Sequence, residues 1–353
     1  MYIRNAWYMA GWSRDVPAAA PTAVRMLDQP LVLYRDDDGG LVALEDRCCH
    51  RLAPLSQGRV EGKDIRCLYH GLKFAPDGSC NEMPGHSAIP KAMKVRAWPV
   101  VERHSAIWIW MGDPERADAA EIADFRGPDH PDWAMLPGRM DYVADYRLIQ
   151  DNLLDLSHVP YVHRASFGRS NAQINEAWAR SEVRVSPLPN GVDVERWLQN
   201  SPAQPQLGLR EGARVDVLNA YDYLVPGVFL LTTAYHAEGT AARYPTSLPD
   251  EPPLFASFSC QAVTPLTARS TCYFFAYGPW TRHPQAASMK DDYEKLALRA
   301  FHEDKTMIEA QQRNIDADPA RRMLLFDVDK APVQYNRLAA TLMATEEREH
   351  VRP

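Results

Sequence analysis

The sequence has no long hydrophobic run and no concentration of positive charge. Of its 353 residues 46% are hydrophobic, yet no apolar stretch reaches the roughly 20 residues that a membrane span needs. The first residues lack the charged and apolar regions of a secretory signal, so we expect a cytoplasmic protein that contacts no membrane. A formal net charge of −7 without a basic stripe argues against a nucleic-acid partner.

Cysteine is also scarce. Six cysteines in a chain of this length are too few for a disulfide framework. Two of them, Cys48 and Cys67, each stand close to a histidine. The other four are expected to be reduced and mostly buried thiols: Cys49, Cys80, Cys260 and Cys272.

The two Cys-His pairs form a complete four-ligand set. Cys48 and His50 are separated by one residue, Cys67 and His70 by two, and sixteen residues lie between the pairs. Two thiolates and two imidazoles suit a tetrahedral zinc ion or a Rieske [2Fe-2S] cluster. Zinc knuckles usually supply two cysteines each, whereas each pair here supplies one sulfur and one nitrogen, which favours the cluster. Two core cysteines with two incidental surface histidines are the third alternative.

The pattern along the chain predicts two domains. Residues 2–112 read as short β-strands with turns between them, including a hairpin over 30–45, and predict an all-β domain. A segment rich in Asp, Pro and Ala follows at 113–138, and beyond it strands mix with helices in an α+β pattern. We therefore expect domains at 1–115 and 116–353. Weakly patterned stretches are expected as loops over a pocket, at 165–180, 199–212 and 236–253.

A second chemical stretch lies at residues 151–163. Asp155 and His158 are three residues apart and share one face of a helix, but His163 would point elsewhere if the helix continued. Pro160 is expected to break the helix and let His163 turn back. The alternative is a helix capped by Asp151 that carries two incidental surface histidines.

A long helix is predicted over 289–315, and it offers a third ligand. Asp304 falls on its apolar stripe, where a buried carboxylate needs a cation or strong donors. With His158 and His163, Asp304 would complete the two-histidine, one-carboxylate set of non-haem Fe(II) oxygenases. Glu303 and Asp291 lie off that face and are weaker choices. Asp304 could instead be a rim residue paired with Arg299 or Lys305.

With both sites read, the whole chain resembles the oxygenase component of a Rieske non-haem iron oxygenase. The cluster motif is matched at Cys48, His50, Cys67 and His70. The mononuclear-iron motif Asn-x-x-Asp-x-x-His-x(4)-His is matched at the four positions Asn152, Asp155, His158 and His163. Further matches resemble the short homotrimeric branch of the vanillate O-demethylase, toluenesulfonate methyl-monooxygenase and dicamba monooxygenase type: 5–8, 102–103, 107–114 and 303–309.

The resemblance implies an N-terminal all-β Rieske domain and a helix-grip-like α+β catalytic domain with an antiparallel sheet and a long C-terminal helix. The implied cofactors are a [2Fe-2S] cluster and a mononuclear Fe(II), with O2 as co-substrate and NADH acting through a separate flavin or iron-sulfur reductase or a ferredoxin. Asn152 and Asp155 are the implied catalytic residues. Asp155 resembles the aspartate that joins the cluster of one subunit to the iron of the next in a homotrimer. Its carboxylate is expected to accept from the His158 ring and, across the interface, from His70 of the next subunit.

The implied activity is mono-oxygenation of a methyl or O-methyl group on a small aromatic acid. Ring hydroxylation by a Rieske oxygenase is the alternative within the class; a Rieske electron carrier and a zinc-stabilised binding module are alternatives outside it. Departures from the family fall at Cys49, where most relatives have Pro, and at Gln261 and Leu231. The last two stand where dicamba monooxygenase holds its substrate with His and Asn, which argues against dicamba as substrate.

Overall fold

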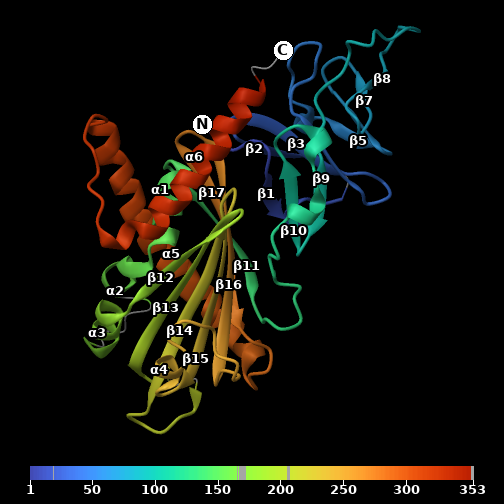
Figure 1. Ribbon diagram of the computed structural model, residues 1–353. Coiled ribbons are helices and arrows are strands. Elements are labelled where there is room, and N and C mark those ends of the chain that lie inside the picture. Colours follow the sequence, from blue (N-terminus) through green and yellow to red (C-terminus); the bar gives the residue numbers. More distant parts are fainter. Residues whose placement is uncertain (19, 165, 167–171, 205–206, 351–353) are drawn as a thin grey trace.

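The N-terminal part of the chain is built from three small antiparallel sheets (Figure 1, blue to cyan). The computed structural model describes residues 1–350 except 19, 165, 167–171 and 205–206. In strand order the sheets are β1-β10-β9, β2-β3-β4 and β5-β6-β7-β8. Their strands are β1 (Trp7–Trp12), β2 (Thr22–Met26), β3 (Gln29–Arg35), β4 (Leu41–Glu45), β5 (Arg59–Glu61), β6 (Asp64–Arg66), β7 (Lys73–Phe74), β8 (Cys80–Glu82), β9 (Val100–Arg103) and β10 (Ala106–Trp110).

Local turn chemistry accounts for the predicted hairpin between β3 and β4. The Asp36 carboxylate accepts hydrogen bonds from the backbone N–H groups of Asp38 at 3.0 Å and Gly40 at 2.7 Å. Gly39 has a φ of +83°, a conformation that costs glycine little. The turn therefore specifies the pairing of two apolar strands, and the expected hairpin is confirmed.

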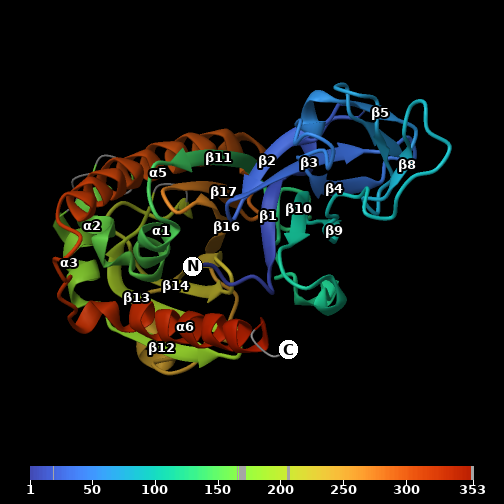
Figure 2. The same ribbon diagram turned by 90° about the horizontal axis from the view of Figure 1, so that it is seen from above.

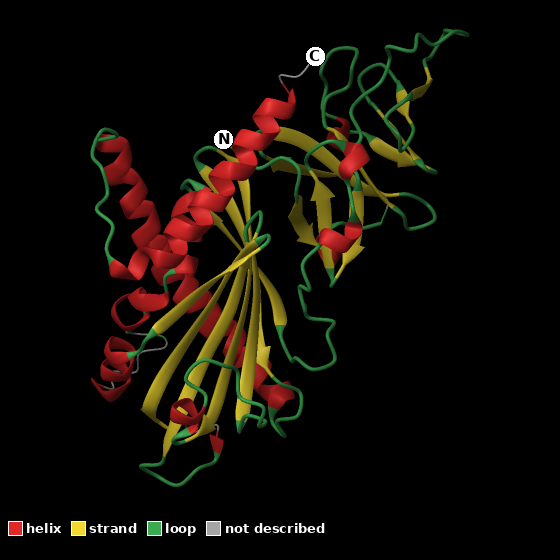
Figure 3. Ribbon diagram, viewed as in Figure 1, coloured by secondary structure: helices red, strands yellow, loops and turns green. Residues whose placement is uncertain are grey.

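The C-terminal part is organised around a seven-stranded antiparallel sheet in the order β11-β17-β16-β15-β14-β13-β12. Figure 3 shows these long strands beside the short strands and loops of the N-terminal part. The predicted α+β class is confirmed. The strands are β11 (Leu136–Tyr142), β12 (Val183–Leu188), β13 (Gly191–Pro202), β14 (Arg214–Leu224), β15 (Val228–Ala237), β16 (Phe255–Thr267) and β17 (Ser270–Pro279).

Helices cover one face of this sheet (Figures 1 and 2), except for the four-residue α4, which packs beside Trp197 and Leu218 on the opposite face. The longest, α5, contains no Gly or Pro, and Pro319 follows its end. Phe301 of α5 packs on Tyr273 and Phe275 of β17, with ring centroids 5.1 and 4.8 Å apart. The helices are α1 (Tyr146–Leu154), α2 (Val159–Val162), α3 (Ala172–Arg180), α4 (Thr240–Arg243), α5 (Ala286–Ala317) and α6 (Lys330–His350). No helix in the described ranges is long and apolar enough to cross a membrane.

The N-terminal part packs against the opposite face of the sheet. Phe274 and Cys260 of that face share a buried cluster with Trp108 of β10. Thr264 donates a hydrogen bond to the carbonyl of Met9 at 2.6 Å. The loops that carry the predicted cluster ligands follow β4 and β6, and they lie at the end of the N-terminal part remote from the sheet (Figures 1 and 2). The domain boundary after residue 115 stays a prediction.

Four elements differ from the expectations. Strand β14 and helix α6 were not predicted. Because β14 is buried on both faces, an apolar Leu218 and a polar Asn219 at its centre break the alternation that marks a strand in a sequence. Residues 172–180, expected as loop, form α3, and 240–243 form α4. Residues 165, 167–171 and 205–206 of the expected pocket loops lie outside the described residues.

Candidate metal centres

Two loops at the tip of the N-terminal part repeat the same backbone geometry. In each loop the cysteine N–H donates to the carbonyl five residues further on, at 2.8 Å. The carbonyls of Cys48 and Cys67 accept from Leu52 at 2.9 Å and Gly71 at 3.0 Å, each four residues further on. Leu52 and Gly71 both have positive φ, at 58° and 79°. The two predicted Cys-His pairs are therefore presented by matching turns.

The side chains of these loops divide into an inner and an outer pair. Cys48 and Cys67 are buried, whereas His50 and His70 are exposed. Burial, with a smaller effect from the adjacent Cys67 thiol, raises the pKa of Cys48 to about 11. The two imidazole rings lie 4.5 Å apart between centroids. Two thiols inside and two imidazoles outside fit a Rieske cluster, in which cysteines hold one iron and histidines the other.

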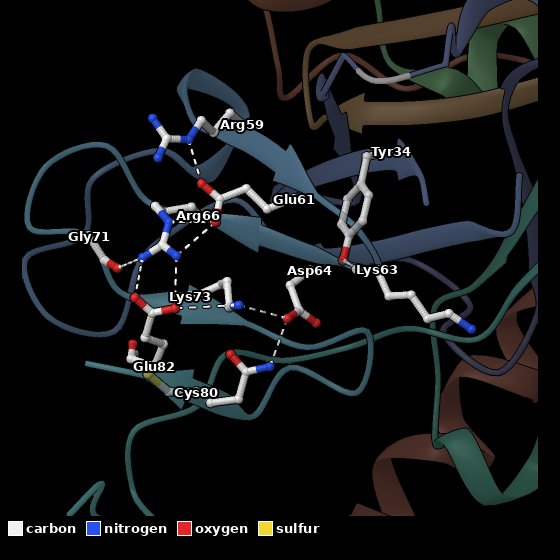
Figure 4. A network of polar contacts seen from close by, with 11 residues as sticks. Tyr34, Arg59, Glu61, Lys63, Asp64, Arg66, Gly71, Lys73, Cys80 and Glu82 are labelled. Carbon is white, nitrogen blue, oxygen red and sulfur yellow. Dashed lines mark hydrogen bonds and ion pairs between the residues drawn. The ribbon is translucent and has the colours of Figure 1, made fainter. Parts of the chain in front are cut away.

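Arg66 anchors the second loop (Figure 4). Its guanidinium donates to the carbonyl of Gly71 at 2.7 Å, directly after His70. Ion pairs to Glu61 at 2.7 Å and Glu82 at 2.8 Å hold the guanidinium in place. The Arg66 hydrogen bonds lower the pKa of Glu82 to about 2. This pairing therefore stabilises the fold above the ordinary carboxyl pKa and is lost only as the pH falls towards 2.

We expect Cys49→Ser to leave the cluster intact. Cys49 stands between Cys48 and His50 in the first loop, at the middle position of the Cys-x-His motif, which supplies no ligand. The visible spectrum of the purified variant should match that of the wild type, whereas Cys48→Ser, the matched control, should bleach it. A bleached Cys49→Ser protein would overturn the assignment.

The second chemical stretch folds as three short pieces. Helix α1 ends at Leu154 and is followed by Asp155, whose backbone is extended, with φ −121° and ψ 97°. Its carboxylate caps the following turn by accepting from the N–H of Ser157 at 2.9 Å. The expected break at Pro160 is therefore wrong, because the helix already ends at Leu154. Pro160 is the second residue of α2, in the first helical turn, where its missing N–H costs nothing.

This interruption brings the two histidines together with Asp304. The rings of His158 and His163 lie 5.2 Å apart between centroids. A carboxylate oxygen of Asp304 is 3.5 Å from Nε2 of His158 and 3.3 Å from Nε2 of His163. One ligand atom from each of the three residues lies within 4.8 Å of the others. Asp304 is only 4% exposed, so the donor set suits a divalent iron that would compensate a buried carboxylate.

Asn152 lies beside these three residues and contacts two of them. Its side-chain amide donates to the Asp304 carboxylate at 3.2 Å and lies 3.5 Å from Nε2 of His158. The structure thus places four residues named by the sequence around one point. Asn152 is positioned to orient Asp304 through this hydrogen bond.

The outer ring nitrogens have different partners. Nδ1 of His158 lies 2.7 Å from the main-chain carbonyl of Asp155, whereas the sequence interpretation assigned this contact to the Asp155 carboxylate. That carboxylate instead accepts from the Ser157 backbone and, at 2.7 Å, from its hydroxyl. Carbonyl contacts of this kind fix the orientation of a ligand ring. Burial lowers the pKa of His158, which favours the neutral, ligating form.

Glu303 contacts the His163 ring, a role that the sequence did not predict. Its carboxylate lies 2.9 Å from Nδ1 of His163 and accepts from the Ser166 hydroxyl at 2.7 Å. Burial lowers the pKa of His163, but Asp304 and Glu303 outweigh it and the net shift is upward. Helical periodicity placed Glu303 off the ligand face. It lies on the far side of the ring, where a carboxylate strengthens and orients a ligating histidine.

We expect Glu303→Gln to weaken iron binding by about 10- to 100-fold, because outer carboxylates of metal-bound histidines contribute on that scale. The measurement is iron retention against a competing chelator, with the melting temperature recorded in parallel. Glu294→Gln, on the same helix, is the matched control. Unchanged iron affinity in Glu303→Gln would show that the carboxylate does not support His163.

The structure also shows the surroundings of Gln261 and Leu231, the two positions expected to depart from dicamba monooxygenase. Gln261 of β16 is buried, and both ends of its amide bond neighbouring side chains: Nε2 donates to the Ser259 hydroxyl at 2.8 Å and Oε1 accepts from the Tyr273 hydroxyl. Leu231 of β15 offers no polar group. Neither residue is free to hold a polar substrate group.

Twin Cys-His loops on a β domain, joined to a buried two-histidine, one-carboxylate set on an α+β domain, define a Rieske non-haem iron oxygenase. Comparisons with known proteins agree. Residues 6–99 match the Rieske [2Fe-2S] domain, and 142–345 match the vanillate O-demethylase oxygenase C-terminal domain. The chain belongs to this family of Rieske mono-oxygenase components.

Relatives match over nearly the full length. The toluene-4-sulfonate monooxygenase system iron-sulfur subunit TsaM1 of Comamonas testosteroni is 38% identical over 98% of both chains. A vanillate O-demethylase oxygenase subunit of Pseudomonas sp. is 32% identical over 98% of this chain and 96% of the relative. A crystal structure of dicamba monooxygenase bound to 3,6-dichlorosalicylic acid superposes with a TM-score of 0.85, at 31% identity over 99% of both chains.

Proposed function

We propose that the chain is the terminal oxygenase of a mono-oxygenase system that oxidises a methyl or O-methyl group of an aromatic acid. The observation that carries the proposal is the buried group of His158, His163 and Asp304 in the same chain as a Rieske domain. The balanced reaction is R–CH3 + O2 + NADH + H+ → R–CH2OH + H2O + NAD+. On an aryl methyl ether the product is a hemiacetal, which breaks down to a phenol and formaldehyde.

The residues have separate tasks. Cys48, His50, Cys67 and His70 would hold the cluster, and His158, His163 and Asp304 would hold the iron. When bound, these groups supply electron transfer and O2 activation, and the protein supplies binding, orientation and exclusion of water. Asn152 orients the Asp304 carboxylate, and Glu303 and Ser166 hold the far side of the His163 ring. The boundary of the two domains is proposed after residue 115.

The test is a screen of methylated and methoxylated aromatic acids with NADH and a generic reductase, measuring O2 uptake, formaldehyde and organic products. Formaldehyde or a benzylic alcohol is expected in proportion to O2 consumed. A ring-hydroxylated product would instead favour the alternative oxygenase reaction. Oxidation and reduction of the cluster with no organic product from any acid would favour an electron carrier.

A separate reductase and a cytoplasmic location complete the proposal. The relatives are described as a subunit or component of a system, which supports an electron-delivering partner, either a flavin and iron-sulfur reductase or a ferredoxin. None of the six cysteines forms a disulfide, as expected in a reducing compartment.

We further propose a head-to-tail homotrimer in which each cluster serves the next subunit. The exposed His50 and His70 are flanked by exposed apolar side chains of Leu52, Leu68 and Tyr69. A second exposed apolar group, residues 323–326, follows α5 on the opposite side of the molecule (Figures 1 and 2). Two different surfaces that meet head to tail generate a closed ring when the rotation between neighbouring subunits closes, and a rotation of one third of a turn gives a trimer.

We expect Leu324→Asp to convert the trimer to a monomer, because Leu324 is 91% exposed and a charge there would be buried at the contact. Sedimentation should show the change while both metals are retained, and NADH-driven turnover should fall with the trimer. Leu248→Asp is the matched control, since Leu248 is also an exposed leucine, at 58%. A trimeric Leu324→Asp protein would remove residues 323–326 from the interface.

A further inference from the structure

A row of polar side chains crosses the helix-covered face of the large sheet. Arg196 of β13 pairs with Asn219 of β14, Asn219 pairs with Thr233 of β15, and Thr233 pairs with Ser257 of β16. Directly paired residues of antiparallel strands project to the same face. Their rows of neighbours are mostly apolar, with Tyr221 and Phe229 packed at 4.9 Å between ring centroids. The polar row therefore interrupts a hydrophobic face.

The row is buried, yet its donors are incompletely used. Arg196 and Asn219 are each 6% exposed. Arg196 donates from Nη1 to the Ser181 hydroxyl at 2.9 Å, but its Nε has no partner among the described residues. The Asn219 oxygen accepts from the Thr233 hydroxyl at 2.9 Å, which leaves its Nδ2 without a partner there. Two neighbouring strands thus present unused N–H donors side by side.

Arg196 is also a buried cation without an ion pair. Within the described part of the chain, its guanidinium bonds to the Ser181 hydroxyl and forms no ion pair with a carboxylate. Tyr221 and Asp155 act on it only at longer range, and burial lowers its pKa. The face of the guanidinium rests on Trp178 of α3, 5.0 Å from the ring centroid. Because stacking uses the face of the group, the N–H edge remains available for an acceptor.

The row lies next to the metal-bearing turn. The hydroxyl of Tyr221, one step along β14 from Asn219 on the same face, donates to the carbonyl of Leu154 at 2.8 Å. Leu154 ends α1, the helix that carries Asn152. The Asp155 carboxylate acts electrostatically on both Arg196 and His158. A molecule held by Arg196 would therefore lie on the face of the sheet against which α1 and the metal-bearing turn pack.

We propose that Arg196 and Asn219 form the subsite for the anionic group of the substrate, a carboxylate or sulfonate on the aromatic ring. This inference rests on the proposed function and names the substrate feature that the site recognises. A planar fork of N–H donors matches an oxyanion, and a buried cation gains most from an anionic partner. Gln261 and Leu231 are poorer candidates, because the amide of Gln261 is uncharged and bonded to Ser259 and Tyr273, and Leu231 is apolar.

The test compares ligand binding by the fully metallated enzyme without O2. The probes are 4-methylbenzenesulfonate, 4-methylbenzoate and the uncharged 4-methylbenzamide, with dissociation constants measured by calorimetry. Arg196→Gln should weaken binding of both anions by at least about tenfold, the scale of a lost charged hydrogen bond, and leave the amide unchanged. Arg196→Lys should restore part of the anion affinity. Unequal losses for the two anions identify which one the subsite fits better.

The matched control is Arg184→Gln. Arg184 lies on the neighbouring strand β12 and faces the opposite side of the sheet, where it pairs with Glu195. The Arg184→Gln variant should bind all three probes with the affinity of the wild type. If Arg196→Gln does not fold, Asn219→Val tests the same subsite and should weaken only the anions.

Three results would overturn the proposal. The first is a wild type that binds the anions no more tightly than the amide, and the second is unchanged anion binding in Arg196→Gln. The third is an Arg196→Gln variant that loses iron and binds all three probes equally more weakly. The proposed function fails separately. If the anions bind through Arg196 but no probe is oxidised when NADH and reductase are added, the subsite stands and the assigned reaction does not. If the enzyme oxidises only uncharged methylarenes, the assigned reaction stands and the anion subsite does not.

Discussion

Asp304→Ala is expected to abolish turnover and remove the mononuclear iron while the Rieske spectrum remains. The Asp304 carboxylate is buried and stands between the two ligand histidines, 3.5 Å from His158 and 3.3 Å from His163. Without it, two neutral imidazoles would hold a divalent ion with no anionic ligand. We expect activity to fall by at least about a thousandfold, since the metal provides the reaction chemistry.

Iron content and the visible spectrum measure the two centres separately. Asp304→Ala should lose only the mononuclear iron, because the cluster loops belong to the other part of the chain. Asp291→Ala is the matched control, an exposed carboxylate on the same helix, and should retain iron and activity. Iron retained in Asp304→Ala, or lost in the Asp291 control, would refute the assignment.

Asp155→Asn is expected to retain the fold, the trimer and both metals but to lose turnover by about a hundredfold or more. Asparagine keeps the size of the side chain and an oxygen that can accept from Ser157. It removes the negative charge. In the proposed trimer that charge faces His70 of the next subunit. The loop that carries this exposed residue follows β6 and lies at the end of the N-terminal part remote from the large sheet (Figures 1 and 2).

The decisive measurement is a single turnover. The variant is reduced beforehand and mixed with substrate and O2, and reoxidation of the cluster is followed by its absorbance. Slow reoxidation is expected, with Asp151→Asn, on the preceding helix, behaving as the wild type. A wild-type rate in Asp155→Asn would show that this carboxylate does not couple the centres.

The burial pattern of α5 shows what helical periodicity can predict from a sequence and what it cannot. Asp304 was selected from the sequence because it lies on the same stripe as Ala297, Phe301 and Ile308, and all four are buried. Helical geometry repeats every 3.6 residues, so a stripe can be read without tertiary contacts. The same reasoning set Glu303 aside. Its contact with His163 depends on the angle at which α5 crosses the turn after α1, which no local pattern contains.

Local chemistry and tertiary packing thus determined different parts of this protein. The sequence by itself determined the two ligand motifs, the hairpin at Asp36–Gly40 and the stripe of α5, because turns, caps and helical faces depend on residues a few positions apart.

Only the tertiary structure decided the strand register that aligns Arg196 with Asn219, the carboxylate behind His163 and the carbonyl behind His158. These contacts join segments brought together by burial of the sheet and helices. Their free energy arises from packing between distant parts of the chain, so the one-dimensional pattern does not encode them in any short window.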